Sequence, residues 1–191
     1  MDGKLIIFSA PSGSGKTTIY KKLIAKGLPL EFSVSACSRP MRKGEIDGQD
    51  YYFLSVETFK KKIANDEFLE WEEVYAGSFY GTLKSELTRI WQDGKHVLFD
   101  LDVLGGVNIK KIFKEKALAI FIQPPSIEEL ENRLVNRSTE TPETLKKRLD
   151  RAKMELSYAP EFDVCIINDN LDKAVEKAEK VILDFINISN D

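Results

Sequence analysis

A short segment near the start of the chain has the composition of a phosphate-binding loop. It reads Ala10-Pro-Ser-Gly-Ser-Gly-Lys-Thr17 and lies between an apolar run at 5–8 and a stretch of helical periodicity at 16–26. Its one departure from the usual pattern is an alanine in place of the first glycine. Small residues let consecutive backbone N–H groups turn toward phosphate oxygens in front of a helix N-terminus. The spacing predicts that Lys16 lies against the β- and γ-phosphates of a nucleotide and that the Thr17 hydroxyl ligates Mg²⁺.

The loop by itself leaves the reaction open, because GTPases, ATP-driven motors and kinases of small molecules all carry one. A glycine-rich turn with an exposed lysine is the plain structural alternative. The chain lacks the Asn-Lys-x-Asp sequence with which a GTPase recognises guanine, and motor ATPases usually need a longer chain. A short chain with a mobile basic lid favours a kinase, which must exclude water from the phosphoryl group.

A second group of polar residues is a candidate site for another phosphate. Arg39 and Arg42 lie three residues apart around a proline, with Ser35 upstream and Tyr51 downstream. Guanidinium and hydroxyl donors of this kind form charge-assisted hydrogen bonds to phosphate oxygens. Together with the loop, they predict two phosphate sites, one for a donor and one for an acceptor.

The candidate lid is the segment 130–153, in which seven Lys or Arg residues face four acids. Arg133 and Arg137 lie four residues apart and therefore share a helix face, which lets two guanidinium groups converge on one polyphosphate. A solvated charged helix is the alternative, because charges at this spacing are common on exposed helices.

Composition bounds the class of protein. A length of 191 residues suggests one domain, and a net charge of −3 argues against a generally basic nucleic-acid binder. No apolar run is long enough for a signal peptide or a membrane span, so we expect a cytoplasmic protein that binds neither nucleic acid nor membrane. Cys37 and Cys165 are expected as reduced thiols, and His96, the only histidine, as an ordinary side chain near a strand start.

Apolar runs alternate with helical stretches along the whole chain, which is typical of an α/β protein with a parallel sheet. Helix and strand boundaries follow from capping signals, from glycine and proline, and from periodicity. The expected strands lie at 4–9, 32–36, 51–53, 68–75, 96–102, 117–122 and 164–167. The expected helices lie at 16–26, 56–65 with Ser55 as N-cap, 83–93, 126–136, 141–158 and 171–188.

With these motifs in place, essentially the whole chain resembles the guanylate kinase family of nucleoside monophosphate kinases. The phosphate loop resembles that of the family, in which alanine is an accepted variant. The order Ser35, Arg39, Arg42, Glu45 and Tyr51 resembles the family's acceptor motif. The resemblance implies a kinase that transfers the γ-phosphoryl group of ATP to GMP, and to dGMP as well, with Mg²⁺ as cofactor. Whether the protein is a monomer or a homo-oligomer stays open.

The resemblance also implies roles for individual residues. The implied ATP-binding residues are Ala10, Pro11, Ser12, Gly13, Ser14, Gly15, Lys16, Thr17, Thr18, Arg133, Arg137 and Asn168. The implied GMP-binding residues are Ser35, Arg39, Arg42, Glu45, Tyr51, Glu70, Tyr80, Gly81, Thr82 and Asp102. The implied catalytic residues are Lys16, Arg42, Arg137 and Arg148, and Mg²⁺ would contact Thr17 directly and Asp100 through water. Taken alone, the run from Glu70 to Glu73 reads as a solvated acidic stretch.

The fold implied by the resemblance is a P-loop α/β fold with a five-stranded parallel core sheet. The core would comprise residues 1–33, 86–125 and 158–191, with a GMP-binding lobe at 34–85 and a lid at 126–157. One rival is an inactive scaffold domain of the same fold, which would have a degraded phosphate loop. Another rival is a kinase for a different monophosphate, and the residues Glu70 and Ser35 argue against it.

Overall fold

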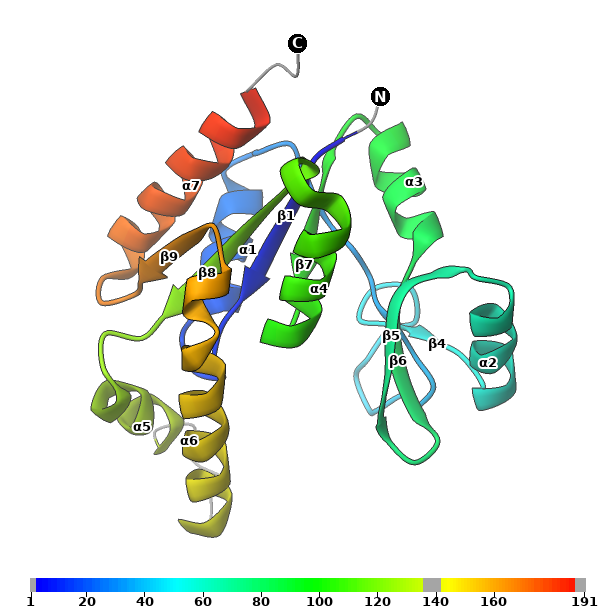
Figure 1. Cartoon of the computed structure of the whole chain (residues 1–191), viewed down its shortest axis with the longest axis horizontal. Helices are drawn as coiled ribbons and strands as arrows, with labels where there is room; N and C mark the ends of the chain where they lie inside the picture. The colour runs from blue at the N-terminus through cyan, green and yellow to red at the C-terminus, as the bar shows by residue number, and fades with distance from the viewer. Residues whose placement is uncertain (1–2, 136–141, 188–191) are drawn as a thin grey trace. The chain divides into compact units, whose positions relative to one another are not determined.

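The structure, a computed structural model, describes residues 3–135 and 142–187. Contacts divide the chain into two compact units. The hairpin unit comprises residues 31–97 together with the first three residues, and the phosphate-loop unit comprises residues 4–30 and 98–191. Each unit is described by itself below, and Figure 1 gives the element labels.

The larger sheet has five strands in the order β2-β7-β1-β8-β9, as the sequence predicted for the core. β8 pairs in parallel with β1 and with the edge strand β9, so that Ile6 lies beside Leu118 and Ile120 beside Val164. All five residues of β1 are buried, and so are six of the seven in β8, as expected for strands covered on both faces. These strands are β1 (Leu5–Ser9), β2 (Leu30–Phe32), β7 (His96–Asp100), β8 (Ala117–Gln123) and β9 (Val164–Ile167).

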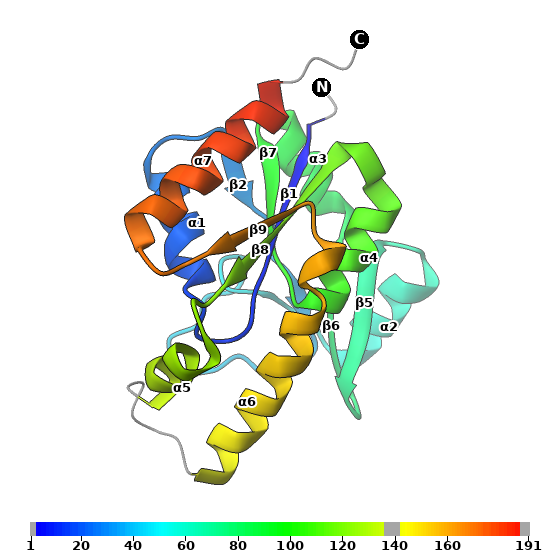
Figure 2. The same cartoon turned by 60° about the vertical axis from the view of Figure 1, so that its left-hand side comes forward.

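Helices cover this sheet on both sides, as Figures 1 and 2 show. In the phosphate-loop unit, α1 and α7 pack against each other and α4 packs against β1 and β8. Short 3₁₀ helices, Lys114–Lys116 and Ala159–Glu161, precede β8 and β9. The α-helices of this unit are α1 (Lys16–Ala25), α4 (Val103–Phe113), α5 (Ile127–Val135), α6 (Pro142–Ser157) and α7 (Leu171–Asn187).

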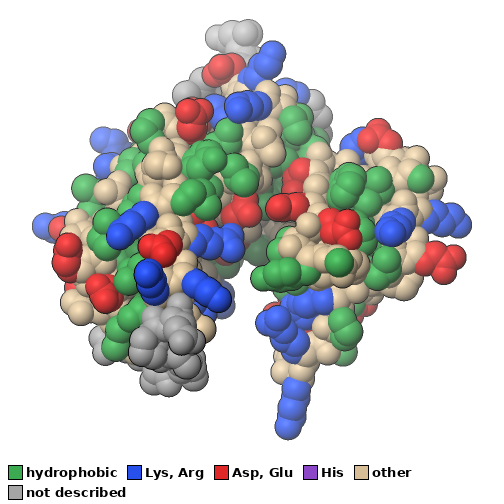
Figure 3. Space-filling view, turned by 60° about the horizontal axis from the view of Figure 1, so that its bottom comes forward, with side chains coloured by type: hydrophobic (Ala, Val, Ile, Leu, Met, Phe, Trp, Pro, Cys, Tyr) green, Lys and Arg blue, Asp and Glu red, His purple; other side chains and the backbone are tan. Residues whose placement is uncertain are grey.

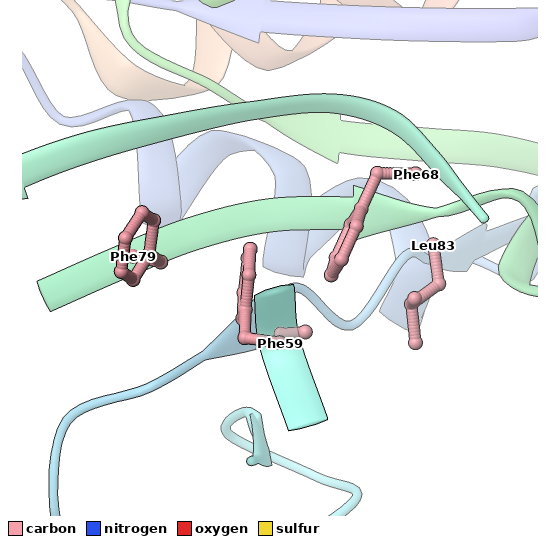
Figure 4. Packing of buried hydrophobic residues seen from close by; sticks show 5 residues of the cluster. Phe59, Phe68, Phe79 and Leu83 are labelled. Atoms are coloured by element: carbon pink, nitrogen blue, oxygen red, sulfur yellow. The ribbon is translucent and has the colours of Figure 1, made fainter. Parts of the chain in front are cut away.

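The hairpin unit is built on a four-stranded sheet with the order β4-β3-β6-β5. Phe59 stacks on Phe68 with ring centroids 4.3 Å apart, and Phe79 and Leu83 complete this small core (Figure 4). The elements are β3 (Ala36–Cys37), β4 (Tyr52–Phe53), α2 (Val56–Ala64), β5 (Phe68–Tyr75), β6 (Ser78–Leu83) and α3 (Lys84–Gln92). As predicted, Ser55 caps α2 by accepting the N–H of Thr58 at 3.0 Å.

The predicted strand at 32–36 is wrong. β2 ends at Phe32 and β3 begins at Ala36, and the two strands belong to different sheets. Between them, the N–H of Val34 donates to the buried carboxylate of Glu86 at 2.9 Å. At Val34 a side-chain carboxylate, and not the backbone of a neighbouring strand, accepts the hydrogen bond of the N–H group. The alternation of apolar residues in the sequence does not reveal this partner.

The predicted strand at 96–102 ends two residues early, at Asp100. Asp102 instead caps α4, because its carboxylate accepts the N–H of Gly105 at 2.8 Å. α4 was not predicted from the sequence, because its two glycines lower helix propensity. Gly106 is needed in this helix, since a Cβ atom there would lie 2.6 Å from the Ser9 hydroxyl oxygen.

Candidate active site

The phosphate loop connects β1 to α1, as the sequence predicted. Gly13 and Gly15 have φ angles of +96° and +88°, a backbone conformation that side chains with a Cβ rarely adopt. The N–H of Ser14 donates to the carbonyl of Pro11 at 3.1 Å, which closes a tight turn. Lys16 is the first residue of α1, so the loop stands in front of the helix N-terminus.

Asn168, the residue directly after β9, supports this loop. Its side-chain amide donates to the carbonyl of Ser14 at 2.8 Å, and its backbone N–H donates to the carbonyl of Gln123 at 2.8 Å. Arg133 donates from Nη2 to the Asn168 carbonyl at 3.1 Å and from Nε to Glu129 at 2.8 Å. The structure thus brings together two residues, Asn168 and Arg133, that the resemblance implies for ATP binding.

A pocket of about 480 Å³ opens beside the loop within the phosphate-loop unit. Lys16 forms an ion pair with Asp100 in this pocket and donates to the Leu101 carbonyl at 3.1 Å. The lysine side chain is only 17% exposed, so its charge lies in partly desolvated surroundings. The residues that line the pocket are those at 10–18 and 100–102 together with Arg148, Arg151 and Glu155.

Two helices carry basic side chains next to this pocket, and Figure 3 shows Lys and Arg groups in blue on the face turned to the viewer. α5 and α6 pack through Leu130, Leu134 and Ala152. Arg148 and Arg151 line the pocket from α6, and Arg151 donates to the buried Glu155 at 2.9 Å. Arg137, the other predicted lid arginine, lies outside the described residues.

The oxygen ligands that the pocket offers fit Mg²⁺. Thr17 and Asp100 both line it and offer a hydroxyl and a carboxylate, the hard oxygen ligands that this ion prefers. Among the described residues, no group of three or more His, Cys, Asp or Glu side chains could hold a metal ion. An ion held by one or two protein oxygens and by substrate phosphates needs no such group.

In the hairpin unit, Arg39 and Glu45 form a bidentate ion pair. The two guanidinium nitrogens lie 2.7 and 2.6 Å from the two carboxylate oxygens. Glu45 also accepts the N–H of Arg42 at 2.7 Å. The hydrogen bonds from Arg39, and then that from Arg42, lower the pKa of Glu45 from its ordinary value of 4.5 to about 2. Glu45 therefore stays ionised at neutral pH and holds Arg39 in one orientation.

Aromatic rings surround the same guanidinium group. It lies 5.0 Å from the ring centre of Tyr51 and 5.4 Å from that of Phe53. Tyr51 in turn meets Tyr80 edge to face, with centroids 6.0 Å apart. Glu45, together with a smaller contribution from Tyr80, raises the pKa of Arg39. The structure thus gathers Arg39, Tyr51 and Tyr80, three of the residues that the resemblance implies for GMP binding.

Glu70 and Thr82 face each other across the β5–β6 hairpin. They are paired in register, and the buried Thr82 hydroxyl donates to Glu70 Oε1 at 2.8 Å. At Gly81 a Cβ atom would lie 2.6 Å from the Glu70 carbonyl, so only glycine allows this close approach of the strands. Ser35 is tied to β4 because its carbonyl accepts the N–H of Tyr52 at 2.9 Å.

One residue that the sequence analysis missed is Glu86. Its carboxylate is almost completely buried in the hairpin unit, where it accepts from Val34, Tyr52 and Arg89. The sequence held a signal, since Glu86 lies four residues before the buried Ile90 and therefore falls on the apolar stripe of its helix.

Comparisons with known proteins agree with this geometry. The guanylate kinase family model matches residues 2–184. The guanylate kinase of Bacteroides fragilis is 53% identical over 190 residues, which cover 100% of this chain and 93% of the relative. That of Porphyromonas gingivalis is 52% identical over 184 residues, covering 96% and 98%.

A solved structure extends the similarity to the fold. The crystal structure of guanylate kinase from Anaplasma phagocytophilum matches with a TM-score of 0.76 and 28% identity, over 98% of this chain and 88% of that one. The P-loop α/β fold predicted from the sequence is therefore confirmed. By its family model, its relatives and its fold, this chain belongs to the guanylate kinase family.

Proposed function

We propose that this protein transfers the γ-phosphoryl group of ATP to GMP, and to dGMP as well, giving ADP and GDP or dGDP. The observation that carries the proposal is an intact phosphate loop, with Lys16 at the start of α1, in a chain that belongs to the guanylate kinase family. The intact loop also argues against an inactive scaffold domain, which has no use for a lysine held inside a phosphate pocket.

The donor, ATP, binds in the pocket of the phosphate-loop unit. Backbone N–H groups of the loop surround its phosphates, and Asn168 keeps the loop in shape through Ser14. Lys16 exchanges its partner Asp100 for the β- and γ-phosphates when ATP enters. The arginines Arg133, Arg137 and Arg148 spread over the triphosphate and offset charge that develops in the transition state.

Mg²⁺ would accompany the ATP and would offset charge on its phosphates. Thr17 would hold the ion directly through its hydroxyl, and Asp100 would hold it through water. Asp100 forms an ion pair with Lys16, and its carboxylate becomes available for this role when Lys16 turns to the ATP phosphates.

The acceptor, GMP, is bound by residues of the hairpin unit and by Asp102. Arg39, Arg42, Tyr51 and Tyr80 bind its phosphate, and Glu45 holds Arg39 in place. Glu70 accepts hydrogen bonds from guanine N1–H and the 2-amino group. Ser35, Gly81, Thr82 and Asp102 complete the contacts of the base. The acceptor phosphate attacks the γ-phosphorus of ATP directly, and no side chain of the protein becomes phosphorylated.

We propose three functional parts with the boundaries that the family resemblance implies. These are a GMP-binding lobe at 34–85, a lid at 126–157 and a core that comprises the remainder. No helix among the described residues has the length and apolar character needed to cross a membrane. We propose that the enzyme works in the cytoplasm, where ATP and GMP are available, and that it binds neither nucleic acid nor membrane.

A coupled assay of ADP release over a panel of monophosphates tests this function. GMP, dGMP, AMP, CMP and UMP are each added with Mg²⁺ and ATP, and the product is identified by phosphorus NMR. We expect GMP to be the best acceptor and the new signal to be that of GDP. ADP release that is independent of acceptor, or a preference for another monophosphate, would overturn the proposal.

A further inference from the structure

A buried carboxylate in the hairpin unit connects three segments of the chain. Glu86 lies in the first turn of α3 and is only 2% exposed. Its Oε2 atom accepts the N–H of Val34 at 2.9 Å, and its Oε1 atom accepts the hydroxyl of Tyr52 at 2.7 Å. Arg89, one helical turn further on, donates to both oxygens at 3.0 Å.

A second acid and two bases complete this network. Glu31 of β2 pairs with Arg89 and accepts from Lys95 at 2.6 Å. Two carboxylates thus face two cations, and the charges of the network balance. Burial raises the pKa of Glu86, but the hydrogen bonds from Arg89, Val34 and Tyr52 outweigh it, so the pKa lies below its ordinary value. Glu86 is therefore an ionised carboxylate, and both of its oxygen atoms accept hydrogen bonds.

Two partners of Glu86 are direct neighbours in the sequence of residues that are proposed to bind GMP. Val34 precedes Ser35, and Tyr52 follows Tyr51. The N–H of Tyr52 also donates to the carbonyl of Ser35 at 2.9 Å, so the two segments are joined to each other as well as to Glu86. Because adjacent side chains of a strand point to opposite faces, Tyr52 turns toward Glu86 while Tyr51 turns toward Arg39 and Tyr80.

We infer that Glu86 is a positioning residue for the acceptor site: it fixes the backbone at Ser35 and Tyr51 through Val34 and Tyr52, and so sets the affinity for GMP. The inference rests on the proposed function. The Glu86 side chain is buried and does not line the donor pocket, so its role is positioning and not catalytic. Its effect is specific for the acceptor, since the donor pocket is built from other segments of the chain.

A purely structural role makes a different prediction. If Glu86 only stabilised the fold, its loss would lower the melting temperature and the fraction of active enzyme, while the folded molecules would bind GMP as before. A positioning role raises the dissociation constant for GMP in molecules that remain folded. The separation of GMP affinity from ATP affinity and from stability therefore decides between the two roles.

The experiment compares two variants in the full-length protein. Glu86→Gln keeps the shape but places an amide donor where Val34, Tyr52 and Arg89 all donate. Tyr52→Phe removes a single hydroxyl and keeps the ring, so it remains informative if Glu86→Gln folds poorly. The matched control is Glu67→Gln, which removes a carboxylate of the same unit that pairs with Lys62 rather than with a neighbour of an acceptor residue.

Binding of GMP and of ATP is measured by calorimetry, and KM, kcat and melting temperature are measured alongside. We expect the dissociation constant and the KM for GMP to rise about 5-fold or more in Glu86→Gln and about 3-fold in Tyr52→Phe, as the loss of buried hydrogen bonds implies. The values for ATP, and all values of the control, should stay close to wild type.

Three results would overturn the inference. The first is a GMP affinity that stays at the wild-type value in both folded variants. The second is a fall of GMP and ATP affinities by the same factor, and the third is an equal loss of GMP affinity in the control. If the wild-type protein neither binds nor phosphorylates GMP, the proposed function is wrong, and the role inferred for Glu86 is wrong as well.

Discussion

The side-chain amide of Asn168 donates to the carbonyl of Ser14 at 2.8 Å and lies so close to Gly15 that a Cβ atom there would clash with it. A residue at the end of β9 thereby fills the space behind the phosphate loop, 154 residues away in the sequence. The loop glycine is required for two separate reasons, its φ of +88° and this close approach.

Gly15→Ala should therefore weaken both the fold and the binding of ATP. Gly27→Ala is the matched control, because Gly27 has a similar φ of +83° and no atom within 4 Å of the added Cβ. We expect the control to cost about 1 kcal/mol of unfolding free energy and Gly15→Ala about 2 to 4 kcal/mol. Urea denaturation measures both. Equal costs would show that the contact with Asn168 does not constrain the loop.

Lys16 offers a second test, on the chemical step. Lys16→Met keeps much of the side-chain volume and removes the charge that faces the transferred phosphoryl group. We expect kcat to fall by about 100-fold or more while the protein stays folded, because the interaction strengthens in the transition state. Lys21→Met, an exposed site on the same helix, is the control. Turnover near the wild-type rate in folded Lys16→Met would contradict the assignment of the loop.

Sequence reasoning located elements whose signals are local. The bounds of β5 and β9 are confirmed to the residue, and those of α1 and α2 are confirmed to within one residue. The burial pattern and the caps of these elements depend on residues that are consecutive in the sequence. β6 was missed although Phe79, Gly81 and Leu83 alternate on its buried side, since its Gly81 weakens the strand pattern. α4 was missed because its Gly106 serves a contact with β1 that exists only in the folded protein.

In the candidate site, too, local features were predicted and contacts between distant segments were not. The sequence predicted Lys16, Arg39, Glu45 and Glu70 as residue types in a recognisable order. It did not predict their partners, because an ion pair such as Lys16 with Asp100 joins segments 84 residues apart whose approach depends on the packing of the sheet. Glu86 was missed for the same reason, since two of the donors to its buried carboxylate, Val34 and Tyr52, come from other segments of the chain and only Arg89 lies on its own helix.

The ion pair of Arg39 with Glu45 predicts a specific dependence of stability on pH. The pKa of Glu45 is about 2 in the folded protein and near its ordinary 4.5 in the unfolded chain. Because the folded value is the lower one, Glu45 stabilises the fold above about pH 4.5, and this contribution is lost as the pH falls toward 2.

Urea denaturation between pH 6 and pH 2 measures this contribution as the difference in unfolding free energy between wild type and Glu45→Gln. We expect a constant difference above about pH 5 that shrinks steadily at lower pH. In an Arg39→Gln background the same difference should lose most of its pH dependence, since the partner that lowers the pKa is gone. A difference that keeps its pH dependence in that background would assign the shifted pKa to another partner.

Glu70 should determine the preference for guanine over adenine. Its carboxylate can accept two hydrogen bonds from the guanine edge, whereas adenine has an unprotonated N1 and no 2-amino group. Adenine would leave a carboxylate facing a lone pair, and sites of this kind reject the wrong ligand by up to about 10⁴-fold. Glu70→Gln keeps the shape but replaces one acceptor with a donor. We expect a large loss of kcat/KM for GMP, a smaller change for AMP, and unchanged ATP binding in the absence of acceptor.

The ratio of kcat/KM for GMP to that for AMP, in wild type and Glu70→Gln, is the measurement that decides. Glu72→Gln provides the control, because Glu72 is an exposed carboxylate two residues further along the same strand. Thr82→Val adds a finer test, since it removes the hydroxyl that donates to Glu70 at 2.8 Å and should lower the same ratio by a smaller factor. An unchanged ratio in Glu70→Gln would remove this residue from base recognition and leave Asp102 and Ser35 as the groups that select guanine.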